Sequence, residues 1–146
     1  MSDARAIIDT LQLAPHPEGG WYRETWRAPG GADGSRGAGT AILFLLEAGQ
    51  KSHWHRVDAT ELWLFQAGAA LTLKTQSGPV RLGPDIAAGD APQHVIAPGA
   101  WQAAEAHEGW SLVACVVVPA FDFAGFELAP PGWEPPAVVP GEPGAV

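Results

Sequence analysis

After about residue 15, the sequence consists of short apolar runs separated by glycine, proline and aspartate. The chain of 146 residues contains 18 glycines and 14 prolines, and Pro15 and Pro17 cannot continue a helix into this region. Short runs between turn residues are typical of strands, and we expect them at residues 21–27, 39–47, 52–56, 61–66, 70–75, 79–82, 93–97, 100–105 and 111–118. The pattern predicts an all-β sandwich, jelly roll or barrel.

The two ends of the chain depart from this strand pattern. Apolar residues recur at helical spacing over residues 3–13, where Ser2 or Asp3 can cap the first turn, so one short N-terminal helix is expected. At the other end, six of the last 18 residues are proline. We therefore predict a single domain over residues 1–133 and a proline-rich tail over residues 134–146.

Composition and charge limit the classes of partner. The net charge is -8 and the chain has only two lysines, so the clustered basic residues that a nucleic acid requires are absent. The longest apolar run, residues 41–46, is far shorter than a membrane helix, and no apolar signal region begins the chain. The expected location is therefore cytoplasmic. Cys115 has no second cysteine to pair with and is expected to be buried as a small apolar side chain.

The segment from Gly49 to Gly68 carries the chemistry that the sequence shows most clearly. Residues two apart in a strand point to the same face, so His53 and His55 are expected to project together. A turn and a second strand then return Glu61 to their side. Two imidazoles and a carboxylate can hold Fe(II), Mn(II) or a similar divalent metal with open positions for a substrate.

Five ordered motifs between about residues 11 and 133 make the chain similar to the cupin-5 family. They are His16-Pro-Glu-Gly-Gly-Trp-Tyr-Arg-Glu24, Ser52-His-Trp-His55, Glu61-Leu-Trp63, Pro98-Gly-Ala-Trp-Gln102 and Pro119-Ala-Phe-Asp-Phe-Ala-Gly-Phe-Glu-Leu128. The resemblance implies a cupin double-stranded β-helix, a jelly-roll barrel with an internal pocket, and a homodimer. It implies no agreed reaction, although the family has been likened to sugar epimerases.

One position departs from the cupin pattern. Gln102 stands where the third histidine of a cupin metal site is expected, and a neutral amide is a poor ligand for Fe, Mn, Ni or Zn. Two interpretations stay open. Either His53, His55 and Glu61 hold a metal with Gln102 as a weak ligand, or no metal is bound and these groups act on the substrate directly.

These interpretations lead to three functions. The first is isomerisation or epimerisation of a sugar-like or carbonyl-bearing small molecule, with His53 or His55 as base, Glu61 as its partner and Tyr22 as the acid. The second is a metal-dependent oxygenase, decarboxylase or isomerase. The third is a non-catalytic module that binds a small ligand between tryptophans.

Further residues are candidates for contact with the ligand. Trp63 shares a strand face with Glu61 and is expected to line the cavity, while Trp101 precedes Gln102, a candidate hydrogen-bond donor to the substrate. Arg23 and Glu24 are adjacent in a strand and cannot both point inward; either forms a salt bridge or contacts the ligand, and an inward arginine grips phosphate or carboxylate. Residues 28–39 contain five glycines and are expected to form a mobile surface loop.

Overall fold

The computed structural model describes residues 3–136, so most of the expected proline-rich tail lies outside the described residues. All nine predicted strands are present, with ends that differ from the prediction by no more than two residues. They are β2 (Trp21–Arg27), β3 (Thr40–Leu46), β4 (Lys51–Val57), β5 (Thr60–Gly68), β6 (Leu71–Thr75), β7 (Gly78–Leu82), β8 (Gln93–Ile96), β9 (Gln102–Ala106) and β10 (Ser111–Val118). Two short strands, β1 (Ala14–Pro15) and β11 (Phe126–Leu128), were not predicted, and 3-10 turns cover Ile86–Ala88 and Phe123–Gly125.

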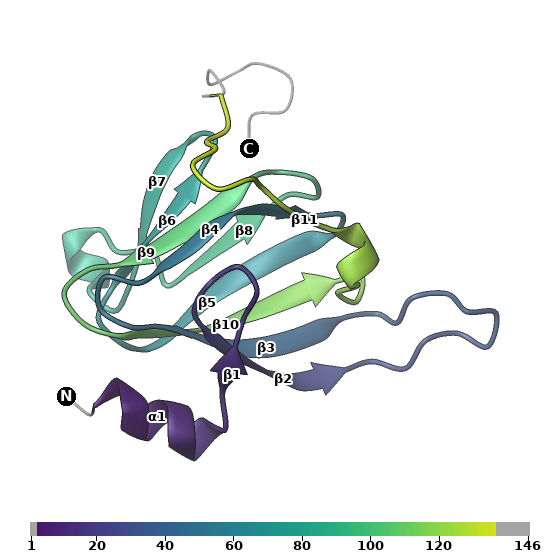
Figure 1. Ribbon diagram of the computed structural model, residues 1–146, viewed down its shortest axis with the longest axis horizontal. Helices are drawn as coiled ribbons and strands as arrows, with labels where there is room; N and C mark the ends of the chain where they lie inside the picture. The colour runs from purple at the N-terminus through teal and green to yellow at the C-terminus, as the bar shows by residue number, and fades with distance from the viewer. Residues whose placement is uncertain (1–2, 137–146) are drawn as a thin grey trace.

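The strands form two antiparallel sheets that pack face to face, as Figure 1 shows. The larger sheet has the order β1-β2-β3-β10-β5-β8, and the smaller has the order β11-β4-β9-β6-β7. Neighbours in each sheet are often distant in sequence, since β10 pairs with both β3 and β5. This mostly-β, two-sheet architecture confirms the predicted fold class.

The helix α1 (Ala4–Leu11) begins at Asp3, whose side chain accepts a hydrogen bond from the backbone of Arg5. Its apolar face, including Ile8, packs against Leu45 and Leu112 on the outer face of the larger sheet. The helix is 8 residues long and ends at Gln12, which adopts the left-handed conformation. No helix in residues 3–136 combines the length and the apolar character needed to traverse a bilayer.

The space between the sheets is divided into a packed part and a polar part. Buried apolar side chains such as Phe44, Leu71, Leu73 and Val113 form the main core. Cys115 belongs to this core, and its burial is as predicted. A smaller cluster around Val117 packs with phenylalanines of the segment after β10. The interior between these two clusters holds the polar side chains described next.

Candidate active site

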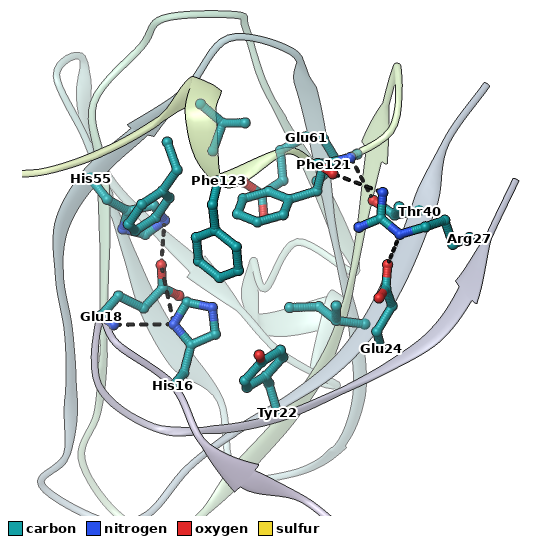
Figure 2. A pocket seen from close by; sticks show the side chains of 14 residues that line it. His16, Glu18, Tyr22, Glu24, Arg27, Thr40, His55, Glu61, Phe121 and Phe123 are labelled. Carbon is teal, nitrogen blue, oxygen red and sulfur yellow. Dashed lines mark hydrogen bonds and ion pairs between the residues drawn. The ribbon is translucent and has the colours of Figure 1, made fainter. Parts of the chain in front are cut away.

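A pocket of about 80 Å³ lies between the sheets. Its apolar wall includes Ile42, Val57 and the phenylalanines at positions 121, 123 and 126. Its polar lining consists of His16, Glu18, Tyr22, Glu24, Arg27, Thr40, His55 and Glu61 (Figure 2). The segment 119–126, which follows β10, covers the pocket and supplies the three phenylalanines of the apolar wall. A cavity of this size accepts only a few non-hydrogen atoms, so only a small ligand, or one small end of a larger one, fits inside.

A buried ion pair joins Glu18 to His55. The Oε2 atom of Glu18 lies 3.0 Å from Nε2 of His55, and the two side chains are 7% and 2% exposed. The other ring nitrogen, Nδ1 of His55, lies 2.8 Å from the backbone oxygen of His53. Two acceptors therefore face the two ring nitrogens of His55, an arrangement that suits the doubly protonated imidazolium.

The pKa values of this pair agree with its geometry. Burial by itself lowers the pKa of His55, but the charge and hydrogen bond of Glu18, with smaller contributions from Glu61 and the His53 carbonyl, raise it to about 9. Burial by itself raises the pKa of Glu18, but the charge and hydrogen bond of His55, together with smaller contributions from His16 and Ser52, bring the pKa below its ordinary value. At neutral pH, Glu18 is a carboxylate and His55 an imidazolium, so His55 lacks the free ring nitrogen that the predicted role of base requires.

Two glycines allow Glu18 to reach the pocket. Gly19 has φ 105°, and a Cβ atom there would lie 2.2 Å from the backbone oxygen of Lys51. Gly20 has φ 84°, and its Cβ would lie 2.8 Å from a methyl group of Leu46. The loop of residues 16–20, between β1 and β2, is held against β4, because the backbone N–H of His53 donates to the Glu18 carbonyl at 2.8 Å. Only glycine permits this close approach at a positive φ.

His16 and Tyr22 lie beside the ion pair. The backbone N–H of Glu18 donates to Nδ1 of His16 at 3.1 Å, which leaves the ring proton of neutral His16 on Nε2. Burial is the main reason that the pKa of His16 is below its ordinary value, although Glu18 opposes the shift. The ring of Tyr22 meets that of His16 edge to face, with centroids 4.5 Å apart. Tyr22 therefore lies in the pocket, where the predicted acid requires it to be.

Behind the pocket, Glu61 is held by a buried relay of hydrogen bonds. The indole N–H of Trp63 donates to Oε1 of Gln102 at 2.7 Å, and Nε2 of Gln102 donates to Oε1 of Glu61 at 2.8 Å. Because an indole can only donate, it determines which end of the amide faces Glu61. Burial raises the pKa of Glu61 above its ordinary value, although the charge of His55 opposes the shift. Trp63 and Gln102 support Glu61 from within the core and are not part of the pocket wall.

His53 does not share the pocket with His55. The pairing of β4 with β9 shifts between Ser52 and His55, so a bulge interrupts the alternation that would have put both imidazoles on one face. Ser52 and His55 point inward, and Nε2 of His53 instead lies 2.9 Å from the backbone oxygen of Pro130. His53 and His55 do lie in a strand, as predicted, but the bulge means that residues two apart do not share a face at this point.

The predicted metal set is therefore not assembled. No group of three or more His, Cys, Asp or Glu side chains within residues 3–136 is placed to hold a metal ion. His55 is already paired with Glu18, and Glu61 accepts a hydrogen bond from Gln102. The donor set within the described part of the chain does not fit a cupin metal ion, and no step of the chemistry below passes through one.

A second bulge turns Arg27 toward the pocket. The pairing of β2 with β3 shifts between Glu24 and Trp26, so Arg27 faces Thr40 on the inner side. Glu24 and Arg27 both line the pocket and form an ion pair at 2.8 Å. Arg23 points away, and its Nη1 atom donates to the Leu11 carbonyl at 3.4 Å.

Trp101 also lies outside the pocket. Its ring packs against Trp133, with centroids 4.5 Å apart, and the guanidinium of Arg56 lies 4.6 Å from its ring centroid. This aromatic contact is a surface feature of the smaller sheet, and a direct role of Trp101 in binding a ligand in the pocket is not supported by its position.

Sequence reasoning missed three functional candidates, which are Glu18, Arg27 and the pocket role of His16. The signal for Glu18 was the two glycines that follow it, since consecutive glycines mark a close backbone approach. Arg27 had no comparable signal, because the bulge that turns it inward depends on the pairing of β2 with β3.

Comparisons with known proteins place the chain in a family. The cupin-5 model, described as cupin superfamily (DUF985), matches residues 5–129. A solved structure from Shewanella oneidensis is 41% identical, covers 88% of this chain and 85% of that chain, and has a TM-score of 0.78. A hypothetical protein from Leishmania major is 32% identical, with 86% of both chains covered and a TM-score of 0.78.

More distant structures agree with the fold alone. An uncharacterised Klebsiella pneumoniae protein with a double-stranded β-helix domain is 14% identical, covers 83% of this chain and 93% of that chain, and has a TM-score of 0.60. No curated protein matches the sequence. With the family model matching most of the chain and two solved relatives above 30% identity, this protein belongs to the cupin-5 family of the cupin superfamily.

Proposed function

We propose that this protein is an acid–base enzyme that isomerises or epimerises a small carbonyl-bearing molecule, with Glu18 as the base. The observation that carries the proposal is the buried Glu18 carboxylate, which lines a small pocket and lies 3.0 Å from the imidazole of His55. A charged carboxylate kept from water in a pocket is costly unless it is paired, and such groups are common in active sites.

The pair supplies both a base and a charge. In the proposed step, an oxygen of Glu18 takes the proton from the carbon next to the carbonyl, and the electron pair of that C–H bond moves into an enolate. Glu18 becomes neutral, while the His55 imidazolium keeps its charge and stabilises the negative enolate in a site of low dielectric. His55 is thus a positioning and electrostatic group rather than the base.

Two further groups complete the proposed mechanism. In its protonated form, which burial favours by raising the pKa, Glu61 can donate a hydrogen bond from its other oxygen to the substrate carbonyl while Gln102 holds its Oε1. Tyr22 can return a proton to the carbon from another direction, which is what inversion at that carbon requires. The structure brings both side chains to the pocket, and Figure 2 shows Tyr22 and Glu61 on different sides of it.

The test is exchange of a carbon-bound proton with solvent deuterium. Wild-type protein would be incubated in deuterated buffer with pyruvate, dihydroxyacetone or glyceraldehyde, and deuterium in the compound followed by NMR. We expect Glu18→Gln to slow the exchange by about 100-fold to 10,000-fold. Glu127→Gln is the matched control, because Glu127 forms an exposed ion pair with Arg56 outside the pocket. A compound that binds in the pocket without exchange in wild-type protein would favour the non-catalytic binding module.

We also propose that the chain forms a homodimer through the outer face of the larger sheet. Partly buried apolar side chains lie there in register, with Leu43 and Leu64 on either side of Ala114, and Leu62 beside Val116. The helix α1 covers only part of this face. Analytical ultracentrifugation tests the proposal: the wild-type protein should sediment as a dimer and Leu64→Glu as a monomer, whereas a monomeric wild type would refute it.

A further inference from the structure

Arg27 stands at the side of the pocket opposite the Glu18–His55 pair. Figure 2 shows its guanidinium facing the pocket across from His16 and Glu18. The same residue also lines an open cleft between the glycine-rich loop 28–37 and the covering segment 119–126, together with Arg36. Arg27 therefore lies where the small cavity joins a wider space that reaches solvent.

The guanidinium is held in one orientation from two directions. Its Nε atom lies 2.8 Å from Oε1 of Glu24, and Nη1 donates to the backbone oxygen of Phe121 at 3.0 Å. Phe121 is fixed in turn, because its backbone N–H donates to the Thr40 hydroxyl at 3.0 Å. Among the residues that the structure describes, these contacts use two of the five N–H donors of Arg27. A guanidinium that two contacts hold in orientation, and whose remaining N–H groups are not used by those contacts, can bind an oxygen acceptor of a ligand.

The glycine-rich loop helps to keep this arrangement in place. The backbone N–H of Ala120 donates to the Gly37 carbonyl at 3.0 Å, and Nε of Arg36 donates to the Ala120 carbonyl at 3.0 Å. Arg36 also pairs with Asp58 at 3.1 Å through Nη1, and its Nη2 donates to the Ala120 carbonyl, so all three of its nitrogens already face protein oxygens. The loop thus braces the segment that holds Phe121, and it leaves Arg27 as the guanidinium that faces both compartments.

The other cation of the pocket, His55, already has a partner at each ring nitrogen. The His55 imidazolium pairs with Glu18, and its second ring nitrogen faces the His53 carbonyl. Both ring nitrogens of His55 therefore already face acceptors, whereas Arg27, which pairs with Glu24 through Nε, keeps further N–H donors on Nη1 and Nη2. A ligand oxyanion thus finds N–H donors at Arg27 and none at His55, which orients such a ligand with its anionic end at Arg27 and its uncharged end at Glu18.

We infer that Arg27 binds an oxyanion of the ligand, a carboxylate or a phosphate, and thereby presents the ligand's uncharged carbonyl end to Glu18. This inference rests on the proposed function for the role of Glu18, and it names the substrate class as small anionic oxo compounds. A carboxylate suits a ligand held wholly in the cavity, whereas a phosphate suits one that extends into the cleft beside Arg36.

Paired probes test the inference by binding alone. Pyruvate is compared with methyl pyruvate, and dihydroxyacetone phosphate with dihydroxyacetone, by NMR titration of Glu18→Gln protein, in which the ligand is not consumed. We expect one anionic probe to bind more tightly than its neutral counterpart. Adding Arg27→Gln should weaken that binding by about 10-fold to 100-fold, and Arg27→Lys by less, because it keeps the charge. Arg23→Gln is the matched control on the same strand, since Arg23 points away from the pocket.

Several results would overturn the inference. These are equal binding of the charged and neutral probes, binding that is unchanged in both Arg27 variants, or no binding of either anionic probe at millimolar concentration. Unchanged NMR spectra outside the pocket would show that the variants are folded. Failure of the proposed function looks different: the anionic probe would bind in an Arg27-dependent way, yet wild-type protein would exchange no carbon-bound proton of it.

Discussion

Removal of the Glu18 charge should change how the stability of the protein depends on pH. In the folded wild type, the pKa of His55 is about 9, compared with an ordinary value of 6.5. Because the folded value is the higher one, protonated His55 stabilises the fold. That stabilisation is fully present below pH 6.5 and is lost as the pH rises through about 9. The difference corresponds to about 3 kcal/mol.

Glu18→Gln removes the main interaction that holds this proton on His55. Burial then lowers the pKa of the imidazole, so the variant should show no loss of stability between pH 6.5 and 9 from this group. We expect the variant to be less stable than the wild type by about 3 kcal/mol near pH 6.5, and the difference to shrink as the pH approaches 9. Urea unfolding, followed by tryptophan fluorescence across this pH range, measures both quantities.

A second carboxylate of the pocket provides the control. Glu24 pairs with Arg27 at 2.8 Å, but both side chains are more than a third exposed. Glu24→Gln should therefore lower the free energy of unfolding by less than about 1 kcal/mol and leave the pH dependence of the wild type unchanged. If Glu18→Gln kept the wild-type decline of stability between pH 6.5 and 9, the assignment of a charged Glu18–His55 pair would be refuted.

Residues around the pocket give three further predictions. Trp63→Phe removes the donor to buried Gln102 and should lower the free energy of unfolding by about 1–3 kcal/mol in urea melts; an unchanged value would mean that the relay does not hold the amide. Gly19→Ala should destabilise the fold by more than Gly49→Ala, because both have positive φ but only Gly19 has a backbone atom in the way of a Cβ; equal losses would contradict the close approach. Added chelator should leave the melting temperature and any proton exchange unchanged, and His53→Gln should leave the proton exchange unchanged; a loss with chelator that added metal reverses would restore the metal hypothesis.

The elements of the fold were predictable because they depend on local signals. Short runs rich in apolar and β-branched residues, separated by glycine and proline, mark β2 to β10, and these signals are visible in the sequence before the partner of each strand is known. The strands β1 and β11 are two and three residues long, and they exist only through pairing with β2 and β4. No periodicity can reveal a strand of that length, because its hydrogen bonds come from a partner that is distant in sequence.

The candidate site was only partly predictable for the same physical reason. His55, Glu61, Tyr22 and Glu24 line the pocket as expected from strand alternation. His53 was expected beside them but lies next to a bulge in β4 that interrupts the alternation, and the bulge after Glu24 turns Arg27 inward; Arg23 points away by ordinary alternation, since Glu24 is the inward one of that adjacent pair. A bulge depends on the register between two strands, and the register is decided by packing across the whole sheet.

By itself, the sequence determined the fold class, the family resemblance and the residue types available for chemistry. Tertiary structure alone decided which of them meet: it placed Glu18 against His55, turned Arg27 inward and directed His53 to the Pro130 carbonyl. It also decided their protonation, since burial and a partner 3.0 Å away convert an ordinary histidine into an imidazolium with a pKa of about 9. Local patterns select strands and turns, whereas charge states and catalytic neighbours depend on contacts between segments that only the folded chain brings together.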